Sequence, residues 1–254
     1  MAGYSGGRKS VLPGVASYDT IQNNHRFNLH PQTGHGVNPY CGAGILDGNE
    51  MNSDMMEAVH FIQPDFILNA VYAPDGSFAQ FFAGHWISAW NKACVMVREI
   101  YSSPIHELAD VVIASAGGYP RDINFYQSMK PLQNAGRAAK EGGVVIMFME
   151  CRDILEPASF SKYLHYDSVV LESQLRRKFD VPGFVALKGL FVAKKVTVIL
   201  VTKEENAEFI LKAGMIPVTS GEAALAKASE ILRTDNWSVT VMTHAGSTVP
   251  VLTI

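Results

Sequence analysis

The chain has 254 residues, of which 48% are apolar and 18% charged, and its formal net charge is −3. This length and composition are typical of a globular protein with a sizeable core, and they exclude a disordered chain. The small negative charge argues against a nucleic-acid-binding protein, which usually carries a basic surplus. No apolar run of about 18 residues occurs, so the sequence predicts no membrane span.

The cysteines and the first residues indicate the compartment. Cys41, Cys94 and Cys151 lie far apart and form no CxxC pair, which predicts reduced thiols in a cytoplasmic protein and no zinc site. Residues 1–9 are glycine-rich and basic, but no apolar segment follows them. They therefore do not predict a signal peptide.

The first hundred residues begin with a stretch rich in Gly, Asn, His and Pro and then become regular. The expected elements are a helix over 17–29, a helix over 52–62, strands over 66–72 and 77–82, and a helix over 85–101. Asn52 or Ser53 is expected to cap the second helix. Asp75 and Gly76 predict the turn of a hairpin.

The rest of the chain alternates short apolar strands with helices. The expected strands cover 110–114, 143–149, 196–201 and 238–242. The expected helices cover 122–138, 166–179 and 204–212, and a last helix is opened by Thr219 and ends near 232. Thr202 with Glu205, and Thr219 with Glu222, fit capping boxes at the last two helices. This alternation predicts the α/β class, with a mostly parallel, Rossmann-like sheet and helices on both faces.

The glycine-rich segment 3–10 ends in Lys9-Ser10, as a phosphate-binding loop does. The spacing fails, because such a loop needs Gly immediately before the Lys and Arg8 stands there. No strand precedes the segment either. A nucleotide triphosphatase is therefore disfavoured, and a flexible N-terminus without function is the alternative.

His25 lies on the first predicted helix, where a lone His is more often a surface or core residue than a metal ligand. His30 and His35 follow in a loop and form no i, i+4 pair with it, so the sequence predicts no isolated zinc site.

A glycine turn, Gly117-Gly118, follows a predicted strand, which is where ligands bind in open α/β sheets. Tyr126, Gln127 and Lys130 lie on the helix behind it, and Gln127 and Lys130 share a face. An amide and a cation beside a glycine turn can hold a carboxylate. A solvated helix face explains the same pattern equally well.

An ordered series of motifs runs along the whole chain: Gly6–Gly14, Asn24-His25, Gly44–Asn49, Asp65–Asn69, Ala114–Pro120, Asp122–Asn124, Tyr126-Gln127 with Lys130, and Gly246–Leu252. Together they resemble the second half of the catalytic domain and the C-terminal domain of the lactate racemase (LarA) family. The series as a whole is far more specific than any one motif.

The resemblance implies an isomerase, a 2-hydroxyacid racemase or epimerase that works by hydride transfer. Its cofactor would be a nickel-pincer nucleotide, a pyridinium-3-thioamide-5-thiocarboxylic acid mononucleotide. Lys9, in the loop with Gly6 and Gly7, would carry the cofactor covalently, and His25 would be a nickel ligand. By position Tyr126, Gln127 and Lys130 would line the substrate site, with Lys130 on the carboxylate of a small 2-hydroxy acid.

The chain departs from the family because it begins just before the lysine loop. The resemblance therefore implies that the acid–base histidines are missing, and no catalytic residue is identified. We expect residues 1–100, joined by 240–254, to be the remainder of an α/β cofactor-binding catalytic domain, and 101–239 to be the C-terminal domain. The alternative to a racemase fragment is a non-catalytic, cofactor-holding module. Such a module would need an N-terminal partner chain or would self-associate through exposed apolar surface.

Overall fold

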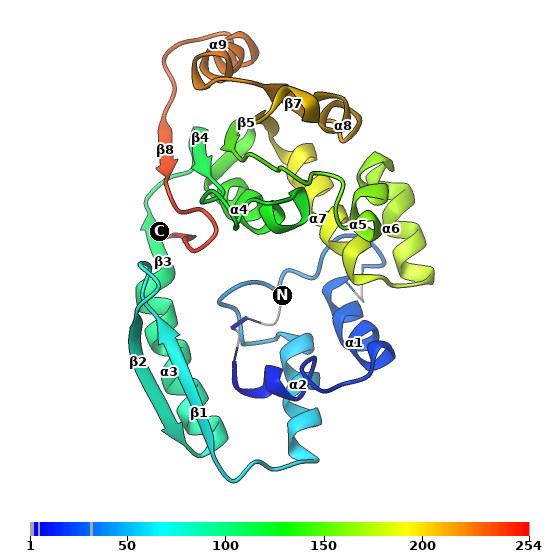
Figure 1. Ribbon diagram of the computed structural model, residues 1–254, viewed down its shortest axis with the longest axis vertical. Coiled ribbons are helices and arrows are strands. Elements are labelled where there is room, and N and C mark those ends of the chain that lie inside the picture. Colours follow the sequence, from blue (N-terminus) through cyan, green and yellow to red (C-terminus); the bar gives the residue numbers. More distant parts are fainter. Residues whose placement is uncertain (1–2, 5, 31–32, 254) are drawn as a thin grey trace. The chain divides into compact units, whose positions relative to one another are not determined.

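The computed structural model describes residues 3–4, 6–30 and 33–253 (Figure 1). The chain forms two compact units, Met1–Ser102 and Ser103–Ile254. None of the described helices is long and apolar enough to cross a membrane. The assignment of 1–100 and 101–239 to functional domains stays a prediction.

The first unit combines short helices with a hairpin. Its elements are η1 (Gly7–Ser10), α1 (Tyr18–His25), η2 (Arg26–Asn28), α2 (Glu50–His60), β1 (Ile67–Tyr72), β2 (Phe78–Gly84) and α3 (Trp86–Tyr101). β1 and β2 pair antiparallel, and α3 packs against both strands. The predicted helices and hairpin are thus present.

The predicted cap of α2 is wrong. The side chain of Asn49 accepts the backbone N–H of Asn52 at 3.0 Å, so the helix begins earlier than expected. Asn49 is in the extended conformation that an N-cap requires, whereas Asn52 already lies inside the first turn.

The second unit contains an α/β sheet. Its elements are β3 (Ser102–Ile105, entering from the first unit), β4 (Ala109–Ser115), α4 (Phe125–Ala138), β5 (Ala139–Phe148), α5 (Ala158–Ser161), η3 (Lys162–His165), α6 (Ser168–Arg177), α7 (Val181–Lys195), β6 (Thr197–Val201), η4 (Glu204–Asn206), α8 (Ala207–Lys212), β7 (Ile216–Val218), α9 (Gly221–Leu232), β8 (Val239–Met242) and β9 (Val249–Leu252).

The main sheet is five-stranded and parallel, in the order β7-β6-β5-β4-β8. Helices α4 and α7 cover one face, and α9 covers the other (Figure 1). Small residues Ala224 and Ala228 bring α9 close to buried Val111, Val144 and Ile199. Because both faces are covered, the strands are almost entirely apolar. The predicted α/β class is confirmed.

Helix α7 was not predicted from the sequence. Asp180 caps it by accepting the N–H of Gly183 at 3.1 Å, and a proline lies in its first turn. The helix packs against α4, α5, α6 and the sheet, so apolar residues recur all round it. A helix buried on most sides lacks the one-sided apolar spacing by which helices are recognised in a sequence.

Both predicted capping boxes are wrong. The hydroxyl of Thr202 donates to the backbone oxygen of Glu150 at 3.0 Å and does not cap a helix. At α9 the cap is Ser220, whose hydroxyl oxygen accepts the N–H of Ala223 at 3.1 Å. Thr202 directly follows β6. Its hydroxyl therefore bonds Glu150, which lies just beyond the end of the neighbouring strand β5.

The return of 240–254 to residues 1–100 stays a prediction. Within the second unit β8 pairs with β4, β9 pairs with β3, and Ala245 donates its N–H to Ser115 O at 3.2 Å. Ile254 lies outside the described residues.

Candidate functional site

The loop that carries Lys9 packs closely against Asn69 and Trp90. Gly6 and Gly7 have φ angles of +78° and +51°, a region that side chains disfavour. The N–H of Gly7 donates to Asn69 Oδ1 at 3.2 Å. A Cβ at Gly7 would lie 2.6 Å from Trp90 Cδ1, so only glycine fits there. Ser5 of this segment lies outside the described residues.

Arg8 anchors the same loop. It is 1% exposed, and its guanidinium carbon lies 4.1 Å from the centroid of the Trp90 ring. Its Nη2 donates to the backbone oxygen of Tyr4 at 3.3 Å. Burial lowers the pKa of Arg8 to about 10, so the side chain stays charged at neutral pH and stacks as a cation. The stacking fixes the backbone next to Lys9.

His25 ends α1 and is 7% exposed. Its Nδ1 lies 2.9 Å from the carbonyl oxygen of Ile21. A carbonyl only accepts, so Nδ1 carries the proton and Nε2 keeps its lone pair. Burial and, to a smaller degree, the positive charge of Lys9 lower the pKa of His25 to about 4. The imidazole is therefore neutral at pH 7, the form that binds metals.

Two buried asparagines hold α1 in place. Asn24 Nδ2 donates to Met51 O at 3.1 Å and to Asp54 Oδ2 at 2.8 Å, both on α2. Asn28 Nδ2 donates to His25 O at 2.7 Å. The bonds of Asn24 attach the helix that carries His25 to α2, and the bond of Asn28 holds the end of that helix; both limit how far the imidazole can shift.

Gly6, Gly7, Lys9 and His25 all lie in the first unit, and the positive charge of Lys9 contributes to the low pKa of His25. Among the described residues, no group of three or more His, Cys, Asp or Glu side chains could hold a metal ion alone. A metal on His25 would need donors from a bound group. The residues present fit a cofactor that is attached to a lysine, supplies its own donors and takes one imidazole.

The other predicted set lies on α4 in the second unit. Tyr126 packs edge-on against Phe160, with ring centroids 5.2 Å apart. Burial raises the pKa of the Tyr126 hydroxyl, and the charge of Asp180 adds to the shift, so the group is a neutral phenol. Gln127 and Lys130 are exposed. The first turns of α4 therefore present a phenol, an amide and an ammonium, which suit a hydroxy acid, although a solvated face has the same composition.

Sequence reasoning missed Arg8 as an anchor and Trp90 as the surface beneath the glycine loop. Arg8 was noted only as a departure from a phosphate-binding loop. The two residues are far apart in the chain, and no spacing within either segment shows that they meet.

Residues 1–36 match the lactate racemase N-terminal domain, and residues 105–182 match the lactate racemase C-terminal domain. The lactate racemase of Thermoanaerobacterium thermosaccharolyticum is 34% identical over 241 residues, which cover 92% of this chain. The chain belongs to the lactate racemase family. A second member, the lactate racemase of Lactiplantibacillus plantarum, is 40% identical over 153 residues, or 60% of this chain.

A solved structure of a family member agrees with this membership. The lactate racemase apoprotein of Thermoanaerobacterium thermosaccharolyticum superposes with a TM-score of 0.88 at 33% identity, over 98% of this chain. A Thermotoga maritima protein shares the fold, with a TM-score of 0.64 at 16% identity over 99% of this chain and 64% of its own. The chain spans 55% and 34% of the two curated family members and 60% of the apoprotein.

Proposed function

We propose that the chain holds a nickel-pincer pyridinium nucleotide and serves the racemisation or epimerisation of a small 2-hydroxy acid. The observation that carries the proposal is the buried, neutral imidazole of His25, whose pKa is lowered by burial and, to a smaller degree, by the charge of Lys9. Its relatives are lactate racemases, which supports the substrate class. When bound, the cofactor supplies a centre that takes hydride from the α-carbon of the substrate and returns it.

In this proposal each residue of the chain has a separate task. Lys9 forms the covalent link, and Gly6 and Gly7 leave room for the loop. His25 gives its Nε2 lone pair to nickel, while the bond from Nδ1 to Ile21 O orients the ring.

The substrate residues are proposed on α4. Lys130 pairs with the carboxylate, Gln127 donates from its amide, and Tyr126 bonds the hydroxyl as a neutral phenol. The proposal assigns no acid–base residue to this chain, so proton transfer to and from the hydroxyl is not attributed to it.

The test is intact-mass spectrometry with nickel analysis after co-expression with the cofactor-synthesis enzymes. We expect a cofactor adduct at Lys9 and roughly one nickel per chain. Lys9→Arg should abolish the adduct because it removes the primary amine. His25→Ala should keep the adduct but lose most of the nickel. Lys212→Arg, an exposed lysine paired with Glu208, is the matched control and should keep both.

Three results would contradict the proposal. They are an adduct on a different lysine, nickel retained in full by His25→Ala, and no adduct on the wild-type chain under conditions that load a family member.

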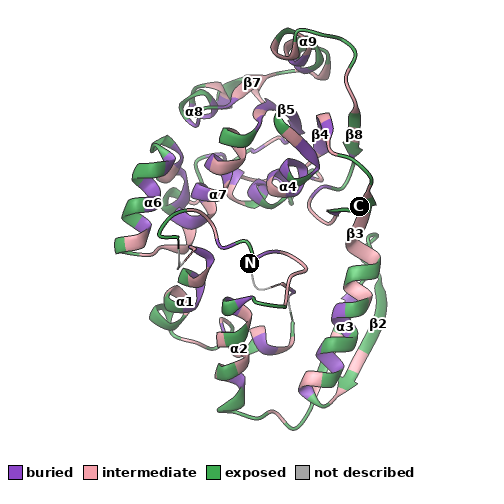
Figure 2. Cartoon of the chain, turned by 180° about the vertical axis from the view of Figure 1, so that it is seen from behind, coloured by how far each residue is buried: buried purple, intermediate pink, exposed green. Residues whose placement is uncertain are grey.

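A cofactor-holding module that works with a partner chain is the second candidate. It is favoured by the face of the β1–β2 hairpin opposite α3, where four large apolar side chains are 52–64% exposed: Leu68, Tyr72, Phe78 and Phe81. Figure 2 shows β2 largely in the colour of exposed residues. Contiguous apolar surface of this kind usually marks an interaction site.

This candidate predicts association of the purified chain. Light scattering should give a mass above that of one chain, and Phe78→Glu should shift the protein towards monomer by placing a charge on the hairpin face. Leu225→Glu, a partly exposed position on α9, is the control and should leave the mass unchanged. A wild-type chain that is monomeric at every concentration would argue against the candidate.

The compartment is also a proposal. The three cysteines are free and buried, which supports the reducing cytoplasm as the location of the protein.

A further inference from the structure

The carboxyl edge of the main sheet contains a cavity of about 410 Å³ that the proposed function does not use. The lining residues follow four adjacent strands, and they are Ser115, Gly118, Asp122, Phe148, Met149, Glu150, Val201, Thr202, Lys203 and Thr219. Ligands of open α/β sheets bind beyond the carboxyl ends of the strands, in pockets of about 300–1,000 Å³. The cavity has both the place and the size of a small-molecule site.

The order of elements around the cavity is that of a mononucleotide-binding half. β4 leads into a glycine turn, where Gly117 and Gly118 have φ angles of +100° and +70°. Helix α4 follows, then β5, which lies beside β4 and ends just before Glu150. In such halves an acid at this position accepts hydrogen bonds from ribose hydroxyls.

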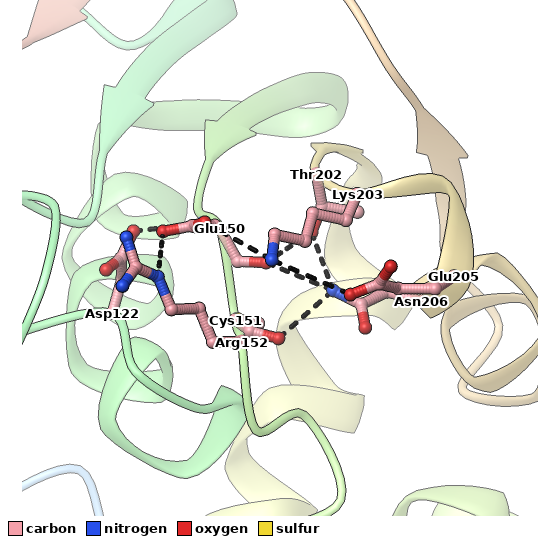
Figure 3. A network of polar contacts seen from close by, with 8 residues as sticks. All are labelled: Asp122, Glu150, Cys151, Arg152, Thr202, Lys203, Glu205 and Asn206. Carbon is pink, nitrogen blue, oxygen red and sulfur yellow. Dashed lines mark hydrogen bonds and ion pairs between the residues drawn. The ribbon is translucent and has the colours of Figure 1, made fainter.

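Glu150 is held rigidly at this position (Figure 3). Its backbone N–H donates to Asp122 Oδ2 at 2.9 Å, and its backbone oxygen accepts from Thr202 Oγ1 and Asn206 Nδ2, each at 3.0 Å. Its carboxylate oxygens lie 2.7 Å from Arg152 Nε and 3.4 Å from Lys203 Nζ. The hydrogen bond from Arg152 and, to a smaller degree, that from Lys203 lower the pKa of Glu150. The carboxylate is therefore ionised and can only accept hydrogen bonds.

The rest of the lining favours a neutral ligand that carries hydroxyls and a flat ring. Asp122 is 4% exposed, and its Oδ1 has no hydrogen-bond partner among the described residues. Arg152 and Lys203 balance the charge of Glu150, so the lining suits a neutral ligand that donates hydrogen bonds to the carboxylates. Phe148 is 38% exposed at the end of an otherwise buried run and offers an aromatic surface. A heterocycle can stack or pack edge-on against such a ring.

We infer that this cavity binds a nucleoside, with the ribose hydroxyls on Glu150 and the base against Phe148. The inference concerns the second unit alone and does not depend on the cofactor proposed for Lys9.

Isothermal titration of the full chain with adenosine tests the inference. We expect adenosine to bind, 2′,3′-dideoxyadenosine to bind at least about tenfold more weakly, and adenine to give no measurable heat. Glu150→Ala should weaken adenosine binding at least about tenfold. Arg152→Ala breaks the same ion pair but leaves the carboxylate, so it should keep most of the affinity.

Thermal unfolding of each variant shows whether it is folded, and if Glu150→Ala does not fold, the two nucleosides compared on the wild-type chain still decide. The inference is overturned if adenosine does not bind, or if its dideoxy analogue binds equally well. It is also overturned if Arg152→Ala loses as much affinity as Glu150→Ala.

Discussion

Replacing Phe125 with alanine is expected to lower the free energy of unfolding of the second unit by about 3–5 kcal/mol. Phe125 is fully buried at the start of α4, and its ring meets Phe160 and Phe209 edge-on, with centroids 6.4 and 6.3 Å apart. Truncation removes apolar contact and leaves a cavity that two rigid rings cannot fill. Urea denaturation followed by circular dichroism measures the loss.

Two control variants test whether the loss of stability comes from the buried ring of Phe125. Phe125→Leu keeps most of the volume and should cost less than about 1.5 kcal/mol. Phe61→Ala, at a side chain that is 92% exposed, should change stability by no more than about 0.5 kcal/mol. If Phe125→Ala destabilised the chain no more than Phe61→Ala, the packing described for the start of α4 would be wrong.

Gly7→Ala is expected to damage the lysine loop through two separate effects. The φ angle of +51° disfavours any side chain, and the new Cβ would lie 2.6 Å from Trp90 Cδ1. Together they should lower the free energy of unfolding of the first unit by about 2–4 kcal/mol. They should also reduce the cofactor adduct at Lys9, because the backbone must move away from Trp90. Thermal unfolding and intact-mass spectrometry measure the two effects.

Gly34→Ala serves as a control that introduces the backbone strain without the contact with Trp90. Gly34 has a φ angle of +68°, but nothing lies within 4 Å of the Cβ position. This variant should cost only about 1–2 kcal/mol and leave the adduct at Lys9 intact. Equal destabilisation by the two substitutions would show that contact with Trp90 does not shape the loop.

The α/β fold could be predicted because strands covered on both faces, such as 143–149, are short and apolar, and amphipathic helices separate them. Helix α7 could not, since burial on most sides removes the one-sided pattern. The wrong caps have a related cause. Thr202 and Asn52 are residue types that cap helices, but which of several neighbouring polar residues does so depends on where the helix begins.

The candidate site could be predicted only in part. The positions of Lys9 and His25 came from an ordered resemblance, and their roles stay predictions. That His25 is buried and neutral follows from the packing around α1, which its sequence does not show. Glu150 and Arg152 follow β5, whereas Lys203 follows β6 and meets Glu150 only because the two strands are neighbours in the sheet.

The pairing of β8 with β4 constrains the timing of folding during synthesis. Ser238, which directly precedes β8, donates its N–H to Asp110 across a separation of 128 residues. A ribosome adds about 5–20 residues per second, so this side of β4 stays without its partner for roughly 6–25 seconds after it is made. An apolar strand with an open edge can pair with other chains meanwhile. The newly made chain is therefore expected to need chaperone protection most during that interval.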